Sequence, residues 1–381
     1  MKARRAIILI TAGLIVAPVA RSGHEQPVYP SYYPHEIEIA AVDPQRAGAL
    51  LIAGQLHAYV GRTSRFEAPA PDGIGSVPSL DSFVVVRLNA NSAYASDEIS
   101  ACAVVGAIVR EMATKGGDVI AHPYPITPLH GDYLHHADLA EAASSRLAGS
   151  VDAWASAARG FKVRAEGALA QDIVRPEWRA EDADWDAVVY EVDARRLVES
   201  ATALVNGWSG PRWVRLGWFH AHRVLAEWVE PQFKERVEAD IGRLQTGDVV
   251  DATERANLER DLVRQLTTGC RAAVAGYTLR REYFNATFSA GIENIAYDAL
   301  EGFSSPMFLR TVKLKDFPWN GWLQLGVGQP PAAAWNPIGG FTDDFGRLMW
   351  FAMGDTATIP SPYDHGWVLN RISEVEASPR K

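Results

Sequence analysis

Residues 251–285 read DATERANLERDLVRQLTTGCRAAVAGYTLRREYFN and carry the strongest periodic pattern in the chain. Apolar side chains recur there in steps of four, four, four, four and three, at Leu258, Leu262, Leu266, Cys270, Val274 and Tyr277. This spacing places side chains on one face of an α-helix. Asp251 and Glu254 stand at the positions of a capping box, with an acid as the cap residue. The stretch therefore predicts one amphipathic helix over residues 253–285.

A second helical segment precedes it over residues 216–245. The connection from Thr246 to Ala252 is short, and short connections join helices that pack antiparallel. Pro231 lies inside this segment, and we expect it to kink the helix because proline has no N–H to donate. Together the two segments predict a long central antiparallel helical hairpin.

The sequence before the hairpin is rich in strand and turn residues. Three strand candidates are separated by proline and glycine clusters, namely Glu36 to Val42, Leu50 to Val60 and Phe83 to Leu88. An apolar helix from Ile99 to Thr114 follows, with acidic residues before it and Lys115 after it, as the helix dipole favours. The pattern predicts a β-rich N-terminal part with one buried helix.

The C-terminal region returns to strand-like segments at Met307 to Leu314 and Trp322 to Val327. The predicted class is α+β, with a β-rich N-terminal part, the central hairpin and an irregular, strand-containing C-terminal part. The predicted divisions are a signal peptide, a β-rich region, a mainly helical region and a mixed region packed on the rest, over residues 1–22, 23–131, 132–300 and 301–381.

The composition is that of an ordinary globular protein. The chain has 381 residues, 48% hydrophobic and 22% charged, which excludes a disordered chain because such chains have few apolar residues. Acidic residues outnumber basic ones by 46 to 37, and binding to phosphate backbones needs clustered Lys and Arg. We therefore expect no nucleic-acid partner. Several of the 12 tryptophans, among them Trp322, lie in loop-like sequence, where packing is favoured over a sugar or cofactor platform.

The N-terminus has the three parts of a secretory signal peptide. A basic start at Lys2, Arg4 and Arg5 precedes an apolar run from Ala6 to Ala20, and small residues follow. We predict cleavage near Ser22 and export to the periplasm or beyond, by the general secretory route. The run is shorter than the roughly 20 residues that span a bilayer, so the mature chain is predicted to be soluble, with no transmembrane segment.

Two cysteines remain in the mature chain, Cys102 and Cys270. An oxidising compartment favours a disulfide between any pair that the fold brings together. Each lies in an apolar, helix-like stretch, which fits equally well with two separate buried thiols. The sequence leaves the pairing open.

The densest group of chemically active side chains reads His130-Gly131-Asp132-Tyr133-Leu134-His135-His136. If Asp132 caps the following helix, His135 and His136 lie on the same face as the cap. Such a face suits Zn²⁺, so His130, Asp132, His135 and His136 are candidate ligands, with His220 or His222 able to complete the site. The competing interpretation is that these histidines hydrogen-bond the proline-rich loop before them.

A second candidate metal site is acidic. Asp182, Asp184, Asp186 and Asp193 have the spacing of positions 1, 3, 5 and 12 of an EF-hand loop, which binds Ca²⁺ and would suit a lanthanide. Position 6 is Ala187 instead of glycine, and position 12 is aspartate instead of glutamate. The competing interpretation is an acidic surface loop that leads into a strand, with Asp193 as a helix cap.

The stretch Tyr29-Pro30-Ser31-Tyr32-Tyr33-Pro34-His35-Glu36-Ile37 resembles the start of exported, uncharacterised bacterial proteins encoded near periplasmic quinoprotein dehydrogenases and lanthanide-uptake systems. The resemblance covers the signal and about fifteen residues after it. It implies an accessory periplasmic role without established catalytic residues.

Motifs for nucleophilic catalysis, phosphate loops, dinucleotide binding and covalent haem are absent from the sequence. The sequence therefore predicts a non-catalytic periplasmic accessory or binding protein, with calcium or a lanthanide as the candidate ion. One alternative is a metal-dependent hydrolase that uses the histidine cluster and zinc. Another is a structural partner of a periplasmic protein complex.

Overall fold

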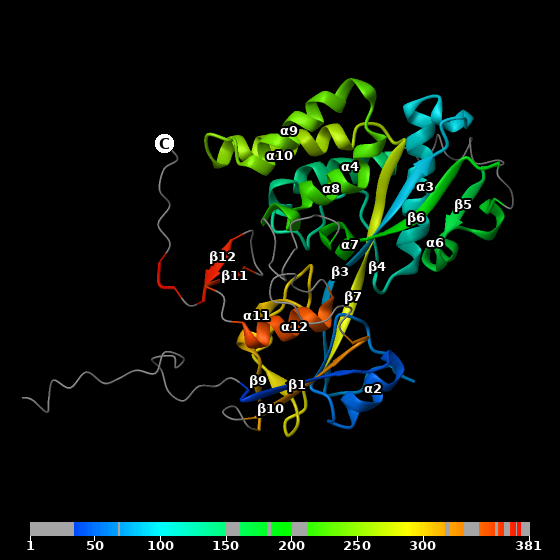
Figure 1. Ribbon diagram of the computed structural model, residues 1–381. Coiled ribbons are helices and arrows are strands. Elements are labelled where there is room, and N and C mark those ends of the chain that lie inside the picture. Colours follow the sequence, from blue (N-terminus) through cyan, green and yellow to red (C-terminus); the bar gives the residue numbers. More distant parts are fainter. Residues whose placement is uncertain are drawn as a thin grey trace, which may run out of the picture.

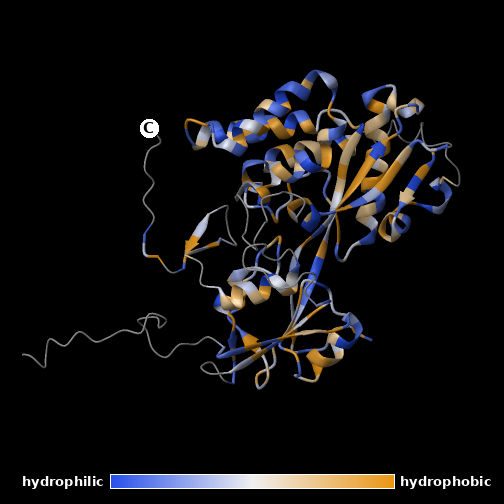
Figure 2. Ribbon diagram, viewed as in Figure 1, coloured by the Kyte–Doolittle hydropathy of each residue, from blue (hydrophilic) through white to orange (hydrophobic). Residues whose placement is uncertain are grey.

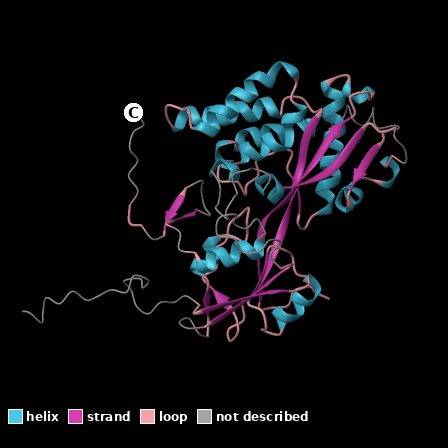
Figure 3. Cartoon of the chain, viewed as in Figure 1, coloured by secondary structure: helices cyan, strands magenta, loops and turns pink. Residues whose placement is uncertain are grey.

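The chain forms two lobes joined by a long pair of strands (Figure 1). The structure is a computed structural model, and it describes residues 34–67, 69–149, 161–180, 184–199, 212–316, 321–330, 343–354, 357–361, 366–370 and 372–374. Within these residues the fold is mixed α/β, and Figure 3 shows helices gathered mostly around one end of the sheet. We call that end the large lobe. The other end, with α2 (Pro44–Ile52), α11 (Pro306–Thr311) and α12 (Asp344–Met353), is the small lobe.

One eight-stranded sheet runs through both lobes in the order β1-β10-β2-β7-β3-β6-β5, with β4 paired to β7. Its strands are β1 (Glu36–Ala41), β2 (Ala58–Val60), β3 (Ile74–Leu88), β4 (Val119–Ala121), β5 (Val163–Glu166), β6 (Ala187–Asp193), β7 (Ala272–Asn285) and β10 (Trp322–Val327). Two small antiparallel sheets pair β8 (Ile292–Glu293) with β9 (Lys313–Leu314) and β11 (Thr358–Pro360) with β12 (Trp367–Leu369). The main sheet crosses the predicted region boundaries at residues 131 and 300, because β3 pairs with β6 and β7 while β1 pairs with β10.

The connecting pair is β3 with β7, antiparallel from Ile74 opposite Asn285 to Arg87 opposite Ala272. At about 3.3 Å per residue, strands of 15 and 14 residues are long enough to run from one lobe into the other. The register shifts between Leu80 and Phe83, near the middle of β3.

Helices cover both faces of the sheet in the large lobe. The α-helices are α2 (Pro44–Ile52), α3 (Glu98–Lys115), α4 (Ala137–Gly149), α6 (Ala168–Ile173), α7 (Ala194–Glu199), α8 (Gly217–Leu225), α9 (Lys234–Thr246), α10 (Ala252–Leu266), α11 (Pro306–Thr311) and α12 (Asp344–Met353). Short 3₁₀ segments are η1 (Ala93–Ala95), η2 (Tyr133–His135), η3 (Pro176–Trp178), η5 (Arg212–Arg215), η6 (Ala226–Trp228) and η7 (Pro231–Phe233).

The side chains of β3 alternate between two cores. Phe83 and Val85 pack with the apolar faces of α8, α9 and α10, whereas Val84 and Val86 pack with α3. This alternation is expected because successive side chains of a strand point to opposite faces. Figure 2 shows the hydrophobic strands at the centre of the large lobe and polar residues along the outside of α9 and α10.

The predicted helix over residues 253–285 is wrong in its second half. α10 ends at Leu266, and residues from Ala272 onward form β7. The bend between them contains Gly269 with φ 72°, a left-handed conformation that glycine adopts without steric cost. The preceding segment is also not one helix, because it divides into α8 and α9 around Pro231, which opens a 3₁₀ turn. Helices α9 and α10 pack on each other (Figure 1).

Two predicted strands are strands only at their C-terminal ends and begin within helices. Residues 44–52 form α2, so only the end of the predicted strand Leu50 to Val60 is a strand, β2. The predicted strand Met307 to Leu314 is mainly α11. Both helices begin with a capping side chain followed by proline, Asp43-Pro44 and Ser305-Pro306, which is a helix-start signal. The predicted strand Phe83 to Leu88 extends further towards the N-terminus, because β3 begins at Ile74.

The disulfide left open by the sequence is present. Cys102, in α3, is bonded to Cys270, in the bend before β7. Both cysteines are buried. The bond joins α3, on one face of the sheet, to the start of the central strand β7.

Asp251 is the N-cap of α10, where its carboxylate accepts a hydrogen bond of 2.8 Å from the backbone N–H of Glu254. We expect Asp251→Ala to lower the free energy of unfolding by about 1 kcal/mol, because one helix N–H loses its partner. Urea denaturation measures this change. Asp251→Asn keeps an acceptor and should stay close to the wild type, and equal midpoints for all three proteins would contradict the assignment of the cap.

Candidate functional site

The predicted histidine cluster lies in the large lobe, between a proline-rich loop and α8. Asp132 is buried, and its carboxylate accepts hydrogen bonds from the backbone N–H groups of Gly217 and Trp218, at 2.9 and 3.3 Å. It therefore caps α8, and not the helix that follows it in sequence, where it makes no capping bond. Burial raises the pKa of Asp132, and these two hydrogen bonds act against that rise.

The structure separates the two adjacent histidines. His135 ends the η2 turn and is exposed, so it does not join Asp132 on a buried face. His136 is fully buried, and its Nδ1 lies 3.1 Å from the hydroxyl of Tyr124. Its Nε2 has no hydrogen-bond partner among the described residues. Burial lowers the pKa of His136 to about 4, so the imidazole is neutral at pH 7.

Glu259 of α10 completes this group and was missed in the sequence. One ligand atom each from Asp132, His136 and Glu259 lies within 4.8 Å of the others, and all three side chains are buried. Burial, with the charge of Asp132, raises the pKa of Glu259 to about 7. The only sequence signal was its position beside Leu258, on the edge of the apolar face of α10.

His130 belongs to a different arrangement. The backbone N–H of Thr127 donates to its Nδ1 at 3.0 Å, so its Nε2 carries the proton and donates to Nδ1 of His220, also at 3.0 Å. His220 in turn donates from Nε2 to the carbonyl of Val214 at 3.1 Å. Both rings are buried, and burial lowers the pKa of each, that of His220 to about 4. This histidine pair uses all four ring nitrogens internally, so neither ring is a metal ligand in this arrangement.

The acidic segment does not form a twelve-residue calcium loop. Residues Ala187–Asp193 are strand β6, so Asp186 and Asp193 lie at opposite ends of it, roughly 20 Å apart at the usual rise per residue. Asp193 accepts from the backbone N–H groups of Arg195 and Arg196 at the start of α7, as the competing interpretation expected. Asp186 accepts from Ser92 and from the backbone of Lys162.

The other two acidic positions add nothing to such a loop. Asp184 forms an exposed ion pair of 2.8 Å with the ammonium group of Lys162. Asp182 lies outside the described residues.

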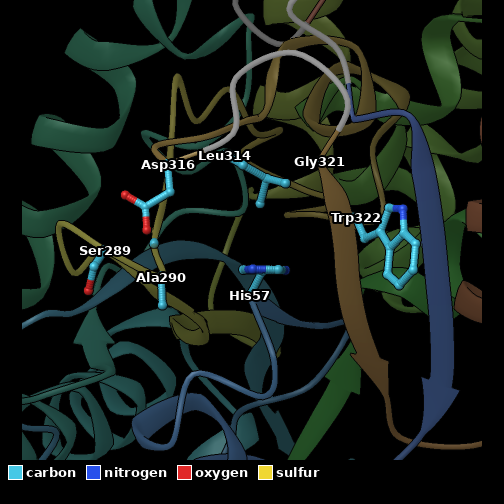
Figure 4. A pocket seen from close by; sticks show the side chains of 8 residues that line it. His57, Ser289, Ala290, Leu314, Asp316, Gly321 and Trp322 are labelled. Carbon is cyan, nitrogen blue, oxygen red and sulfur yellow. The ribbon is translucent and has the colours of Figure 1, made fainter.

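A pocket of about 300 Å³ opens in the small lobe, and Figure 4 shows the side chains around it. It is lined by His57, Ser289, Ala290, Gly291, Leu314, Asp316, Gly321 and Trp322. In Figure 4, His57 lies between Ala290 and Trp322, with Leu314 and Asp316 above it. Trp322 is the first residue of β10, and 64% of its surface is exposed. This volume is at the lower end of small-molecule sites.

A hydrogen bond from the backbone of β10 holds the ring of His57 in place. Its Nδ1 accepts a hydrogen bond of 2.8 Å from the backbone N–H of Gln324. Burial lowers the pKa of His57, so the ring is neutral at pH 7 and its single proton sits on Nε2. The pocket therefore combines a neutral N–H donor, a carboxylate, a hydroxyl and an indole.

Two other cavities differ in character. A wider one of about 750 Å³ lies between α2 and the loop that follows β2, and its lining is mostly apolar, including Ile52 and Phe66. A cavity of about 20 Å³ lies at the junction of the lobes, next to Arg195, Arg215 and Arg347. The second has room for about one water molecule.

No protein-family model and no curated protein matches the chain. Solved structures similar to it include the periplasmic EDTA-binding protein EppA, at 11% identity and a TM-score of 0.42, over 71% of this chain and 57% of that one. Haemophilus influenzae OppA in complex with RPPGFSPFR is similar at 11% identity and 0.40, over 71% and 56%. The ABC transporter-associated periplasmic binding protein DppA from Helicobacter pylori is similar at 12% identity and 0.38, over 72% and 55%.

This chain thus spans a little more than half the length of each of these structures. Within the described ranges, no helix combines the length and the apolar character that crossing a membrane requires.

Proposed function

We propose that the chain is an exported binding protein that holds a small polyhydroxylated solute, of the sugar class, in the small-lobe pocket of Figure 4. The observation that carries this proposal is that an exposed indole, a neutral imidazole and a carboxylate line one pocket. The predicted signal peptide and the resemblance of residues 29–37 to exported bacterial proteins support the export.

Each lining group suits one feature of such a solute. The indole of Trp322 offers a flat apolar face to the C–H face of a sugar ring. The carboxylate of Asp316 accepts hydrogen bonds from hydroxyl groups, and the Nε2–H of His57 donates one to an oxygen. Because the imidazole is neutral, the described lining residues present no cation for a carboxylate or phosphate ligand, which favours an uncharged solute.

The structure gives no support to the hydrolase alternative. Asp132, His136 and Glu259 are only 2%, 0% and 4% exposed, so a substrate cannot reach a metal-bound water held by them in this arrangement. The pocket in Figure 4 contains one carboxylate and no serine–histidine pair at hydrogen-bond distance among its described contacts.

Binding can be measured by isothermal titration calorimetry with a panel of monosaccharides, disaccharides and polyols, next to amino acids, dipeptides and organic acids. We expect one saccharide or polyol to bind with a stoichiometry of one. Trp322→Ala should weaken its binding about tenfold, which corresponds to about 1.4 kcal/mol of lost stacking. Trp367→Ala is the matched control, because Trp367 is an exposed tryptophan on β12 that does not line the pocket.

Binding of an amino acid or a dipeptide that depends on Trp322 would keep the pocket and reject the solute class. If no compound binds, or if Trp322→Ala and Trp367→Ala bind equally well, the pocket is not the ligand site. A role as a structural partner of a periplasmic complex would then become the better hypothesis.

A further inference from the structure

The geometry points to a second site, independent of the solute pocket: Asp132, His136 and Glu259 form a binding site for one divalent transition-metal ion of the zinc class inside the large lobe. The three residues come from separate parts of the fold, namely the loop before η2, the junction of η2 with α4, and α10. The fold brings them together across more than 120 positions of sequence.

The three ligand atoms lie near one another, but farther apart than in a zinc site that holds its ion. The ligand atoms all lie within 4.8 Å of one another, and none of the described hydrogen bonds joins one of the three side chains to another. In a tetrahedral zinc site with bonds of roughly 2.0–2.1 Å, ligand atoms stand about 3.3 Å apart. Side-chain rotations that close each separation by an ångström or so would complete the site.

The imidazole of His136 is held as a metal ligand would be. Nδ1 pairs with the hydroxyl of Tyr124, and metal-binding histidines commonly use their second ring nitrogen for such a hydrogen bond. With Nδ1 as the donor to the tyrosine oxygen, Nε2 is an unprotonated acceptor. This nitrogen is fully buried and has no partner within the part of the chain that the structure describes, so it is an unexplained buried polar atom.

The charges favour a cation. Asp132 and Glu259 are two carboxylates buried close together, where two negative charges would repel each other. Arg255 compensates one of them, with its Nε 3.2 Å from Glu259, while Asp132 has backbone N–H groups as its hydrogen-bond partners. A bound divalent ion would neutralise the remaining charge at the point where both carboxylates meet.

The donor set selects the ion. One imidazole nitrogen and two carboxylates are ligands that zinc accepts, with a water molecule in the fourth position. Calcium and lanthanides need six to eight oxygen ligands, which three buried side chains do not provide. Such an ion would tie the loop at residue 132 to α10 and so brace the α9–α10 pair against the rest of the large lobe.

The test uses the full mature chain, stripped of metal with a chelator and titrated with Zn²⁺ against a chromogenic competitor. We expect one equivalent of zinc to bind and to raise the melting temperature. Glu259→Gln and His136→Gln should each weaken zinc binding at least 100-fold. His135→Gln is the matched control, because this neighbouring histidine is exposed and should keep full affinity.

Circular dichroism shows whether the variants are folded, and Co²⁺ in place of Zn²⁺ gives a visible absorption band that reports the ligand geometry directly. Equal zinc affinity in the wild type and in both folded ligand variants would overturn the site. The same conclusion would follow if His135→Gln alone lost the ion, or if terbium bound in place of zinc. None of these results affects the solute titrations, because the pocket beside Trp322 lies in the other lobe.

Discussion

Removal of the Cys102–Cys270 disulfide is expected to lower the free energy of unfolding by about 2–5 kcal/mol. The two cysteines are 168 residues apart, so the bond restricts a very large loop of the unfolded chain. The chain-entropy model gives about 5 kcal/mol for a loop of this size, as an upper value. Urea denaturation with and without a reductant measures the loss, and the double variant Cys102→Ala with Cys270→Ala should show a similar loss without any reductant.

The reductant itself needs a control, and the double variant provides it. Its unfolding midpoint should not move when the reductant is added, whereas that of the wild type should fall. If the wild type unfolds at the same urea concentration in both states, the bond does not contribute to stability as we expect. Two free thiols in protein taken from the periplasm, unfolded without reduction and alkylated, would show that the bond is absent there.

The error at β7 shows where periodicity stops being informative. A step of four residues keeps side chains on one face of a helix, but it also keeps them on one face of a strand, whose period is two. The step from Cys270 to Val274 therefore fits both structures in sequence, although Cys270 lies before β7 and packs in the other core. The bend at Thr267 to Gly269 separates the helix from the strand. Because β7 is a central strand buried on both faces, its sequence lacks the alternation of apolar and polar residues that would have predicted a strand.

The sequence predicted a helix correctly where the capping residues and the apolar composition both indicated one. The buried helix at Ile99 to Thr114 corresponds to α3, and its acidic N-cap Asp97 bonds the backbone N–H of Ser100. The α2 and α11 segments carry the same kind of start signal, Asp-Pro and Ser-Pro, ahead of apolar residues that also fit a strand. Local signals at helix starts were the more reliable guide in this chain.

The candidate metal site could be predicted only in part. Asp132 and His136 stand four positions apart, and their proximity in space follows from local structure. Glu259 is one of many glutamates on charged helices, and nothing in its own neighbourhood sets it apart. Glu259 joins the site only because α10 packs against residues 132–136. That contact depends on the fold of the whole large lobe.

The split of the two adjacent histidines has the same cause. A helix cap at Asp132 would have placed His135 and His136 together, but the chain forms a 3₁₀ turn there, and α4 begins only at Ala137. Asp132 is drawn instead to the start of α8, 85 positions further on. The carboxylate of Asp132 thus caps the start of α8, which is distant in sequence, and not the helix that follows it directly.

The buried pair His130 and His220 should make the fold sensitive to acid. The chain of hydrogen bonds runs from Thr127 through both rings to the carbonyl of Val214, and each ring nitrogen already has its role as donor or acceptor. A proton added to Nδ1 of His130 would face the N–H of Thr127, and one added to Nδ1 of His220 would face the N–H of His130. Protonation of either ring therefore breaks a buried hydrogen bond and places a charge in the core.

The direction of the pH dependence follows from the lowered pKa. His220 has a pKa of about 4 in the folded chain and an ordinary value of 6.5 when exposed, so the unfolded chain binds the proton more tightly. The contribution of His220 to stability is then complete above pH 6.5 and is lost as the pH decreases towards 4, where this one residue costs about 3 kcal/mol. The pKa of His130 is lowered as well, by burial and by the neighbouring His220, so its contribution has the same sign.

Unfolding free energies measured in urea between pH 7.5 and pH 4 isolate this effect when the wild type is compared with His220→Gln. Glutamine does not titrate in this range, and its amide can still donate to the carbonyl of Val214, so its curve should be flatter than that of the wild type by about 2 kcal/mol at pH 5. His135→Gln removes an exposed histidine of the same chain that takes no part in the hydrogen bonds of His130 and His220, so its curve should follow that of the wild type. Carboxylates that titrate on acidification affect all three proteins alike and cancel in the comparison. Parallel curves for the wild type and His220→Gln would mean that His220 takes up its proton in the folded core without loss of the bond to His130, and the assignment of a neutral, internally satisfied pair would then be wrong.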